Sequence, residues 1–105
     1  MLTGSPSQIE WALEIMPRVA AEFDRVAAAF ELRATQQAGQ TQSDTRVIVE
    51  IVREKRSEVL ACEKAGYFLA EWREISDQVR RLIADDPRYQ AILARRNDQT
   101  SSAKT

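Results

Sequence analysis

The apolar residues in the first third of the chain recur at helical spacing. One series is spaced by seven residues and consists of Ile9, Met16, Phe23 and Phe30, and a second, three residues further on, consists of Ala12, Val19 and Val26. An α-helix places positions with this spacing on one face. The pattern therefore predicts a helix over residues 6–38 with one buried stripe. At its start, Ser5-Pro6-Ser7-Gln8 has the form of a capping box with proline at the first helical position.

Pro17 lies inside this predicted helix. Proline removes one helical hydrogen bond and its ring clashes with the preceding turn, so we expect the helix to kink or to break here. The apolar spacing continues on both sides of Pro17, which favours one kinked helix. The polar segment 36–43 ends the pattern, and Gly39 is predicted to lie just past the helix end, followed by a loop.

A second helical pattern extends from residue 44 to residue 84. It contains two apolar series spaced by seven residues, which are Ala65, Trp72 and Val79 in one case and Phe68, Ile75 and Leu82 in the other. Asp44 or Ser43 can cap its start, and residues 45–83 contain no proline and a single glycine. The pattern predicts one continuous helix over residues 44–84, about 60 Å long at ~1.5 Å per residue.

The sequence Asp85-Asp86-Pro87 marks the end of that helix and the start of another. Asp86 is a good N-cap and Pro87 a good first helical residue, so a short third helix is predicted over residues 87–96. Residues 98–105 are polar and have no apolar anchor, which predicts a disordered tail. Residues 1–97 then form a single helical domain, as the chain length of 105 residues allows.

These elements predict an all-α fold, in which a long antiparallel helical hairpin is followed by a short C-terminal helix. Two helices cannot cover each other on all apolar sides, so we expect a second copy of the chain to complete a helical bundle as a homodimer. The core and interface candidates are Ile9, Trp11, Met16, Phe23, Phe30, Phe68, Trp72 and Ile75. Trp11 lies beside the main stripe, and its indole needs cover from the second helix, the third helix or another chain.

The types of residue present argue against catalysis. The chain has no histidine, which removes the common zinc sites, the Ser-His-Asp triad and the usual general base near neutral pH. It also has no glycine-rich phosphate loop. Cys62, the only cysteine, falls on the apolar stripe, where a small core residue is the favoured interpretation. We therefore expect no enzymatic activity, no cofactor and no metal.

The sequence also contains signals for the cellular compartment of the protein. A single cysteine excludes an intrachain disulfide and fits a reducing compartment. No apolar run approaches the ~20 residues of a membrane span, and the N-terminus has no basic region followed by an apolar block. We expect a cytoplasmic, bacterial protein without membrane contact.

The net charge of −1 argues against a chain that binds polyanions over its whole surface. Basic residues and one tyrosine do gather toward the C-terminal end, namely Arg80, Arg81, Arg88, Tyr89, Arg95 and Arg96. Arginines in such a patch can contact phosphates while a tyrosine stacks on a base. The favoured interpretation is that Asp77, Asp85 and Asp86 neutralise much of this charge.

Two functional hypotheses follow from these patterns. The first is a small helical module for protein–protein interaction or structure, which acts as a homo-oligomer and can engage a further, unidentified protein. The alternative is a nucleic-acid-binding accessory protein that uses the basic C-terminal end. The first is favoured because charge clustering alone is a weak signal.

Residues 2–15 read LTGSPSQIEWALEI. This segment resembles the pattern L-x-G-[ST]-x-x-Q-I-x-W-A-x-x-I of a group of small uncharacterised bacterial and mobile-element proteins. The matching residues are Leu2, Gly4, Ser5, Gln8, Ile9, Trp11, Ala12 and Ile15. The arginine that follows in the group is Met16 here, and the group's second segment, A-x-x-W-I-D-x-R, has at best a degenerate counterpart in residues 65–72. The resemblance implies no activity, but it implies that Gln8 and Trp11 belong to a shared structural feature.

Overall fold

The computed structural model describes the backbone of residues 1–103 and the side chains of residues 1–97, and it confirms the all-helical fold. The helices in this range are α1 (Pro6–Thr35), α2 (Gly39–Leu60), α3 (Ala65–Glu71), α4 (Ile75–Ala84) and α5 (Pro87–Ala103). The molecule is elongated, with extents of 60 × 25 × 18 Å. None of the helices within residues 1–103 combines the length and apolar character needed to cross a lipid bilayer.

The predicted capping box starts α1. The Ser5 hydroxyl accepts a hydrogen bond from the Gln8 backbone N–H at 3.3 Å, and the Gln8 side chain accepts one from the Ser5 N–H at 2.9 Å. Of the two alternatives at Pro17, a break is wrong because α1 continues through this residue. Ala12 and Val19 are both fully buried on either side of it, so core packing holds the two halves of α1 in one register.

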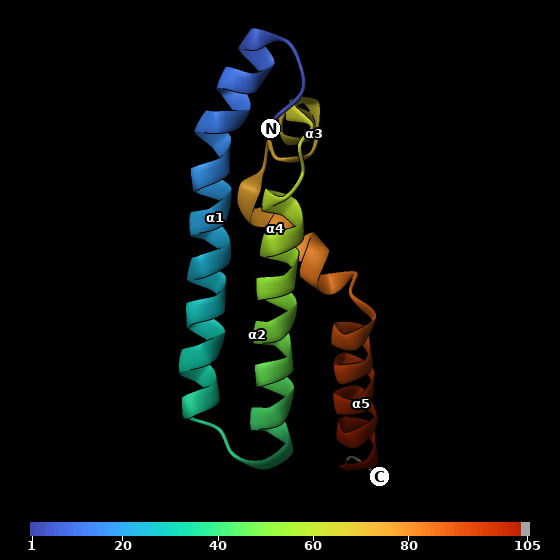
Figure 1. The fold of residues 1–105 in the computed structure, drawn as a ribbon. Coiled ribbons are helices and arrows are strands. Elements are labelled where there is room, and N and C mark those ends of the chain that lie inside the picture. Colours follow the sequence, from blue (N-terminus) through green and yellow to red (C-terminus); the bar gives the residue numbers. More distant parts are fainter. Residues whose placement is uncertain (104–105) are drawn as a thin grey trace.

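α1 and α2 lie side by side with opposite chain directions (Figure 1). The turn between them is shorter than predicted, because Gly39, expected just past the end of the first helix, is instead the first residue of α2. Its φ of +63° is the left-handed conformation that glycine adopts without strain. Asp44, a predicted N-cap, therefore lies within α2. The turn is closed by side chains, as the buried Thr45 hydroxyl donates to the Gln37 side chain at 2.6 Å.

The prediction of one continuous helix over residues 44–84 is wrong, because the chain breaks after Leu60 and again after Glu71. At the first break, the N-terminal segment forms hydrogen bonds with backbone groups of residues 63 and 65. The Thr3 N–H donates to the Glu63 carbonyl at 2.6 Å, and the Ala65 N–H donates to the Thr3 carbonyl at 2.9 Å. These bonds use backbone groups that a continuous helix needs for itself.

The second break lets the chain turn back over the α1–α2 pair. Trp72 ends α3 and is only 1% exposed, with its ring 5.8 Å from that of Phe23 on α1. α4 then carries Val79 and Ile83 into the same core. Figure 1 shows α3 beyond the upper end of α2, α4 crossing α2, and α5 running down beside α2. The core is thus shared by all five helices of residues 1–103.

α5 begins where the sequence predicted. The Asp86 carboxylate accepts a hydrogen bond from the Arg88 backbone N–H at 2.9 Å, with Pro87 as the first helical residue. The helix does not end at residue 96 but continues to Ala103, since residues 97–103 contain no proline or glycine to stop it. The tail predicted as disordered over 98–105 is therefore helical in its backbone as far as Ala103, and residues 104–105 lie outside the described part of the chain.

Candidate functional site

The predicted core and interface residues fall into three groups. Phe23, Phe68 and Trp72 are fully or almost fully buried, so they build the core. The half-buried residues at the margin of this core are Ile9, Met16, Phe30 and Ile75. Trp11 differs from both groups, because 58% of its surface is exposed. Within the described residues, none of the candidate covers for its indole encloses it.

Trp11 forms one side of a groove with a volume of about 420 Å³, which we call the Trp11 groove. Its lining comes from α1, α3, the chain between α3 and α4, and the first residue of α4. It consists of Trp11, Ile15, Arg18, Phe68, Leu69, Trp72, Arg73 and Ile75. Most of these residues are apolar, and the two arginines are exposed. The groove is therefore an apolar depression with basic residues beside it.

The helical spacing of α1 explains this side of the groove. Ile15 and Arg18 follow Trp11 by four and seven residues, so the three side chains share one flank of α1. Opposite them, the break after Glu71 lets Trp72 pack inward while Arg73, the next residue, stays exposed. The indole N–H of Trp72 is buried without a hydrogen-bond partner in the described residues.

The N-terminal segment fixes α3 against the start of α1. Gly4 has a φ of +146°, and a Cβ at this position would lie 2.9 Å from the Gln8 side-chain oxygen and 3.2 Å from the Cβ of Ala65. Only glycine fits both the backbone angle and this close approach. Gly4 and Gln8, two residues of the N-terminal pattern, thus hold α3 close to the start of α1 and position the α3 residues that face Trp11. This contact gives a physical reason for the spacing of Gly4 and Gln8 in the pattern.

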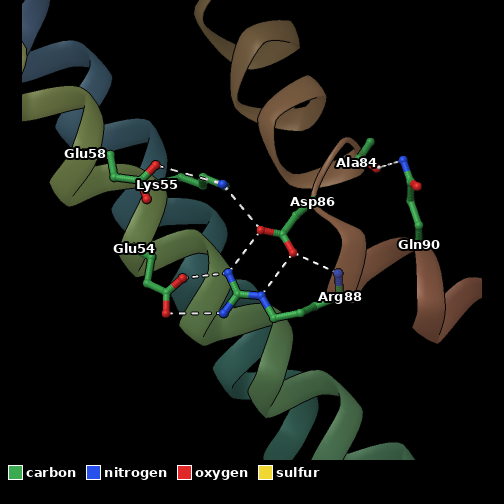
Figure 2. Close-up of polar contacts among 7 residues, drawn as sticks. All are labelled: Glu54, Lys55, Glu58, Ala84, Asp86, Arg88 and Gln90. Atoms are coloured by element: carbon green, nitrogen blue, oxygen red, sulfur yellow. Dashed lines mark hydrogen bonds and ion pairs between the residues drawn. The ribbon is translucent and has the colours of Figure 1, made fainter.

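The predicted basic end does not gather on one surface. Figure 2 shows the Arg88 guanidinium between two carboxylates, 3.0 Å from Asp86 and 2.6 Å from Glu54 on α2. Lys55 approaches the same Asp86 carboxylate at 3.3 Å. Hydrogen bonds from Arg88 hold the pKa of Asp86 well below its usual value, even though burial acts in the opposite direction. These charges tie the start of α5 to α2.

Further along α5, Arg95 pairs with the buried carboxylate of Asp44. Burial opposes ionisation of Asp44, but hydrogen bonds from Gln40 and Arg95 hold its pKa below the usual value. The charge of Arg96 acts in the same direction. Arg81 is exposed and lies apart from these pairs. Of the three carboxylates predicted to neutralise the basic end, Asp86 pairs with Arg88, whereas Asp77 and Asp85 form no ion pair with the described residues. Glu54 and Asp44 supply the other carboxylates, for Arg88 and Arg95.

Arg80 and Tyr89 belong to a second groove, between α1, α4 and the start of α5, with a volume of about 510 Å³. We call it the arginine groove, and its lining consists of Arg25, Val26, Ala29, Phe30, Arg33, Arg80, Ile83, Ala84 and Tyr89. Arg25 and Arg33 were not among the predicted basic residues, because the basic cluster evident in the sequence lies near the C-terminus. The spacing of Arg18, Arg25 and Arg33 along α1, at seven and eight residues, was the available signal.

No protein-family model matches this chain, and neither a curated protein nor a solved structure shows significant similarity to it.

Proposed function

We propose that this protein is a non-catalytic interaction module that self-associates as a homodimer through the Trp11 groove. The observation that supports this is the 58% exposure of Trp11 beside an apolar groove. Tryptophan is a large apolar side chain and is enriched among the residues that dominate binding energy at protein interfaces. An exposed indole next to a concave apolar surface fits an interface.

A second copy fits this surface because the exposed flank of α1 is complementary to itself. Along this flank Trp11, Glu14, Ile15 and Arg18 follow one another at helical spacing. A twofold axis between residues 14 and 15 makes the two α1 helices antiparallel and places Trp11 of each copy opposite Arg18 of the other. The guanidinium can then stack on the indole face, and Ile15 of each copy joins the apolar centre of the contact.

Charge on this flank also suits two identical copies. Glu14 and Arg18 are exposed and form no ion pair with the described residues. In the antiparallel arrangement Arg18 of each copy lies opposite Trp11 of the other and within about one helical turn of its Glu14, so the guanidinium can also reach that carboxylate. Such isologous pairing is the commonest form of closed association.

We do not extend the proposal to nucleic acid. Two of the predicted phosphate contacts, Arg88 and Arg95, are already paired with carboxylates of this chain. Binding to a phosphate backbone needs several uncompensated positive charges along one surface.

Sedimentation velocity over about 5–500 µM, a range that covers weak dimers, tests the proposal with two matched variants. Trp11 and Leu13 are both 58% exposed, but lie on opposite flanks of α1. We expect the wild type and Leu13→Glu to dimerise and Trp11→Glu to remain monomeric, with unchanged helix content by circular dichroism. A wild type that stays monomeric throughout, or a dimeric Trp11→Glu, contradicts the proposal. Loss of the dimer in both variants contradicts its assignment to the Trp11 flank.

A further inference from the structure

The arginine groove combines an apolar floor with a basic rim. Phe30 is half-buried and Ile83 is almost fully buried, and both lie against the hydrophobic core. The rim holds three guanidinium groups, from Arg25 and Arg33 on α1 and Arg80 on α4. No carboxylate lines the groove. An occupant therefore needs an apolar face and negative charge.

The charge of the rim is only partly compensated within the chain. Arg25 forms a two-pronged ion pair with Glu22, at 2.6 Å and 2.8 Å, and this pair lowers the pKa of the Glu22 carboxyl. Arg33 lies over the Phe30 ring, 5.4 Å from its centre. Among the side chains that the structure describes, neither Arg33 nor Arg80 has a carboxylate within ion-pair distance. The Glu22 carboxylate also interacts with Arg80 through its charge. The three guanidinium groups of the rim thus share this one paired carboxylate and keep an excess of positive charge, although the chain as a whole has a net charge of −1.

We propose that the arginine groove binds an acidic amphipathic helix of another protein. Apolar side chains of that helix, at positions i, i+3, i+4 and i+7, lie on the aliphatic part of the floor, formed by Val26, Ala29 and Ala84. Its Asp or Glu side chains reach Arg33 and Arg80, and planar guanidinium groups bind carboxylates in a two-pronged geometry. The groove volume of about 510 Å³ accommodates a few large side chains, not a whole domain.

Single-stranded nucleic acid fits this groove less well. Base stacking needs exposed aromatic faces along a basic track. Here Arg33 already covers the Phe30 ring, and Tyr89 is half-buried at the edge of the groove. The mainly aliphatic floor favours side chains of a protein over bases. This groove shares no residue with the Trp11 groove, so the inference does not depend on dimerisation.

Fluorescence anisotropy with a designed peptide tests the inference. The probe is a labelled 16-residue helical peptide with leucine on one face and glutamate elsewhere. Its controls are a scrambled peptide of the same composition, a peptide with lysine in place of glutamate, and a 15-nucleotide single strand. We expect only the ordered acidic peptide to bind, and Trp11→Glu to bind it as well as the wild type does. No binding by this peptide, or equal binding by the scrambled peptide or the single strand, overturns the inference.

Two adjacent arginines provide a matched comparison in the protein. Arg80 lines the groove, whereas Arg81 is exposed elsewhere on the same helix. Arg80→Glu and Arg33→Glu should each weaken peptide binding at least about tenfold, because each replaces an attractive charge by a repulsive one. Arg81→Glu should change it less than about threefold. Equal weakening by Arg80→Glu and Arg81→Glu means that the peptide responds only to overall charge, which also overturns the inference.

Discussion

The Asp86 carboxylate accepts three hydrogen bonds from Arg88, one from the Arg88 backbone N–H at 2.9 Å and two from the guanidinium at 3.0 Å each. The same guanidinium reaches Glu54, so one short segment both caps α5 and joins it to α2 (Figure 2). Asp86 is only 5% exposed. The neighbouring Asp85, by contrast, is exposed and makes no such contacts. A single side chain, that of Asp86, therefore caps α5 and takes part in joining it to α2.

Replacing Asp86 by alanine should lower the free energy of unfolding by about 1–2 kcal/mol, the range for loss of an N-cap that is also paired. Urea denaturation measures the change. Asp85→Ala serves as the control and should shift the free energy by less than about 0.5 kcal/mol. Equal effects of the two substitutions contradict the role assigned to Asp86.

Stability should also fall in acid. The pKa of Asp86 is lowered first by its hydrogen bonds to Arg88, and those of Asp44, Glu22 and Glu54 are lowered as well. A carboxyl with a depressed pKa in the folded state stabilises the fold above its unfolded pKa, ~4 for these groups, and this contribution is lost as the pH falls further.

We therefore expect the free energy of unfolding, measured in urea, to be nearly constant between pH 7 and pH 5 and to decrease below about pH 4. In Asp86→Asn the decrease should be shallower, because one of the contributing groups no longer titrates. An identical pH dependence in the wild type and in Asp86→Asn is the result that speaks against the pairing.

Gly4 and Gly66 offer a second matched test. Gly4→Ala forces a side chain into a φ of +146° and to within 2.9 Å of the Gln8 side-chain oxygen, which should cost about 1–3 kcal/mol of stability. Gly66 lies in α3 with nothing within 4 Å of an added Cβ, so Gly66→Ala should be neutral or stabilise by up to about 1 kcal/mol. Thermal denaturation of both variants gives the comparison, and a tolerated Gly4→Ala argues against the fixed N-terminal segment.

Truncation of the two tryptophans should change the free energy of unfolding by very different amounts. Trp72→Ala removes a side chain that is 1% exposed and packed against Phe23, which should cost about 3–5 kcal/mol. Trp11→Ala removes one that is 58% exposed, and at concentrations where the chain is monomeric it should change stability by less than about 0.5 kcal/mol. A large loss of monomer stability in Trp11→Ala means that the indole packs within its own chain.

Local signals in the sequence predicted the starts of α1 and α5 correctly. The capping box at Ser5 and the Asp86-Pro87 start were both identified from side chains that act within a few residues. The seven-residue spacing of Ala65, Trp72 and Val79 also marked buried positions correctly. It could not show that the chain breaks just before Ala65, because that break depends on hydrogen bonds with Thr3, about 60 residues away in sequence.

The grooves were harder to predict for the same reason. Trp11 was recognised as lacking cover, but Leu69 and Arg73 face it only because α3 is separated from α2 and α4. Arg33 on α1 and Arg80 on α4 line the same groove. Residue spacing within one segment cannot predict that residues of two segments lie together. The neutralisation of Arg88 by Glu54 is equally a product of the tertiary fold.

Fluorine NMR of the chain labelled with 5-fluorotryptophan tests the Trp11 interface most directly, because the two tryptophans give one resonance each. A Trp11→Phe variant assigns the signals. Dimerisation through the Trp11 groove predicts that the Trp11 resonance shifts as the protein concentration rises, while that of the buried Trp72 moves much less. A Trp11 resonance that stays constant, in a sample whose sedimentation shows association, contradicts the proposed interface.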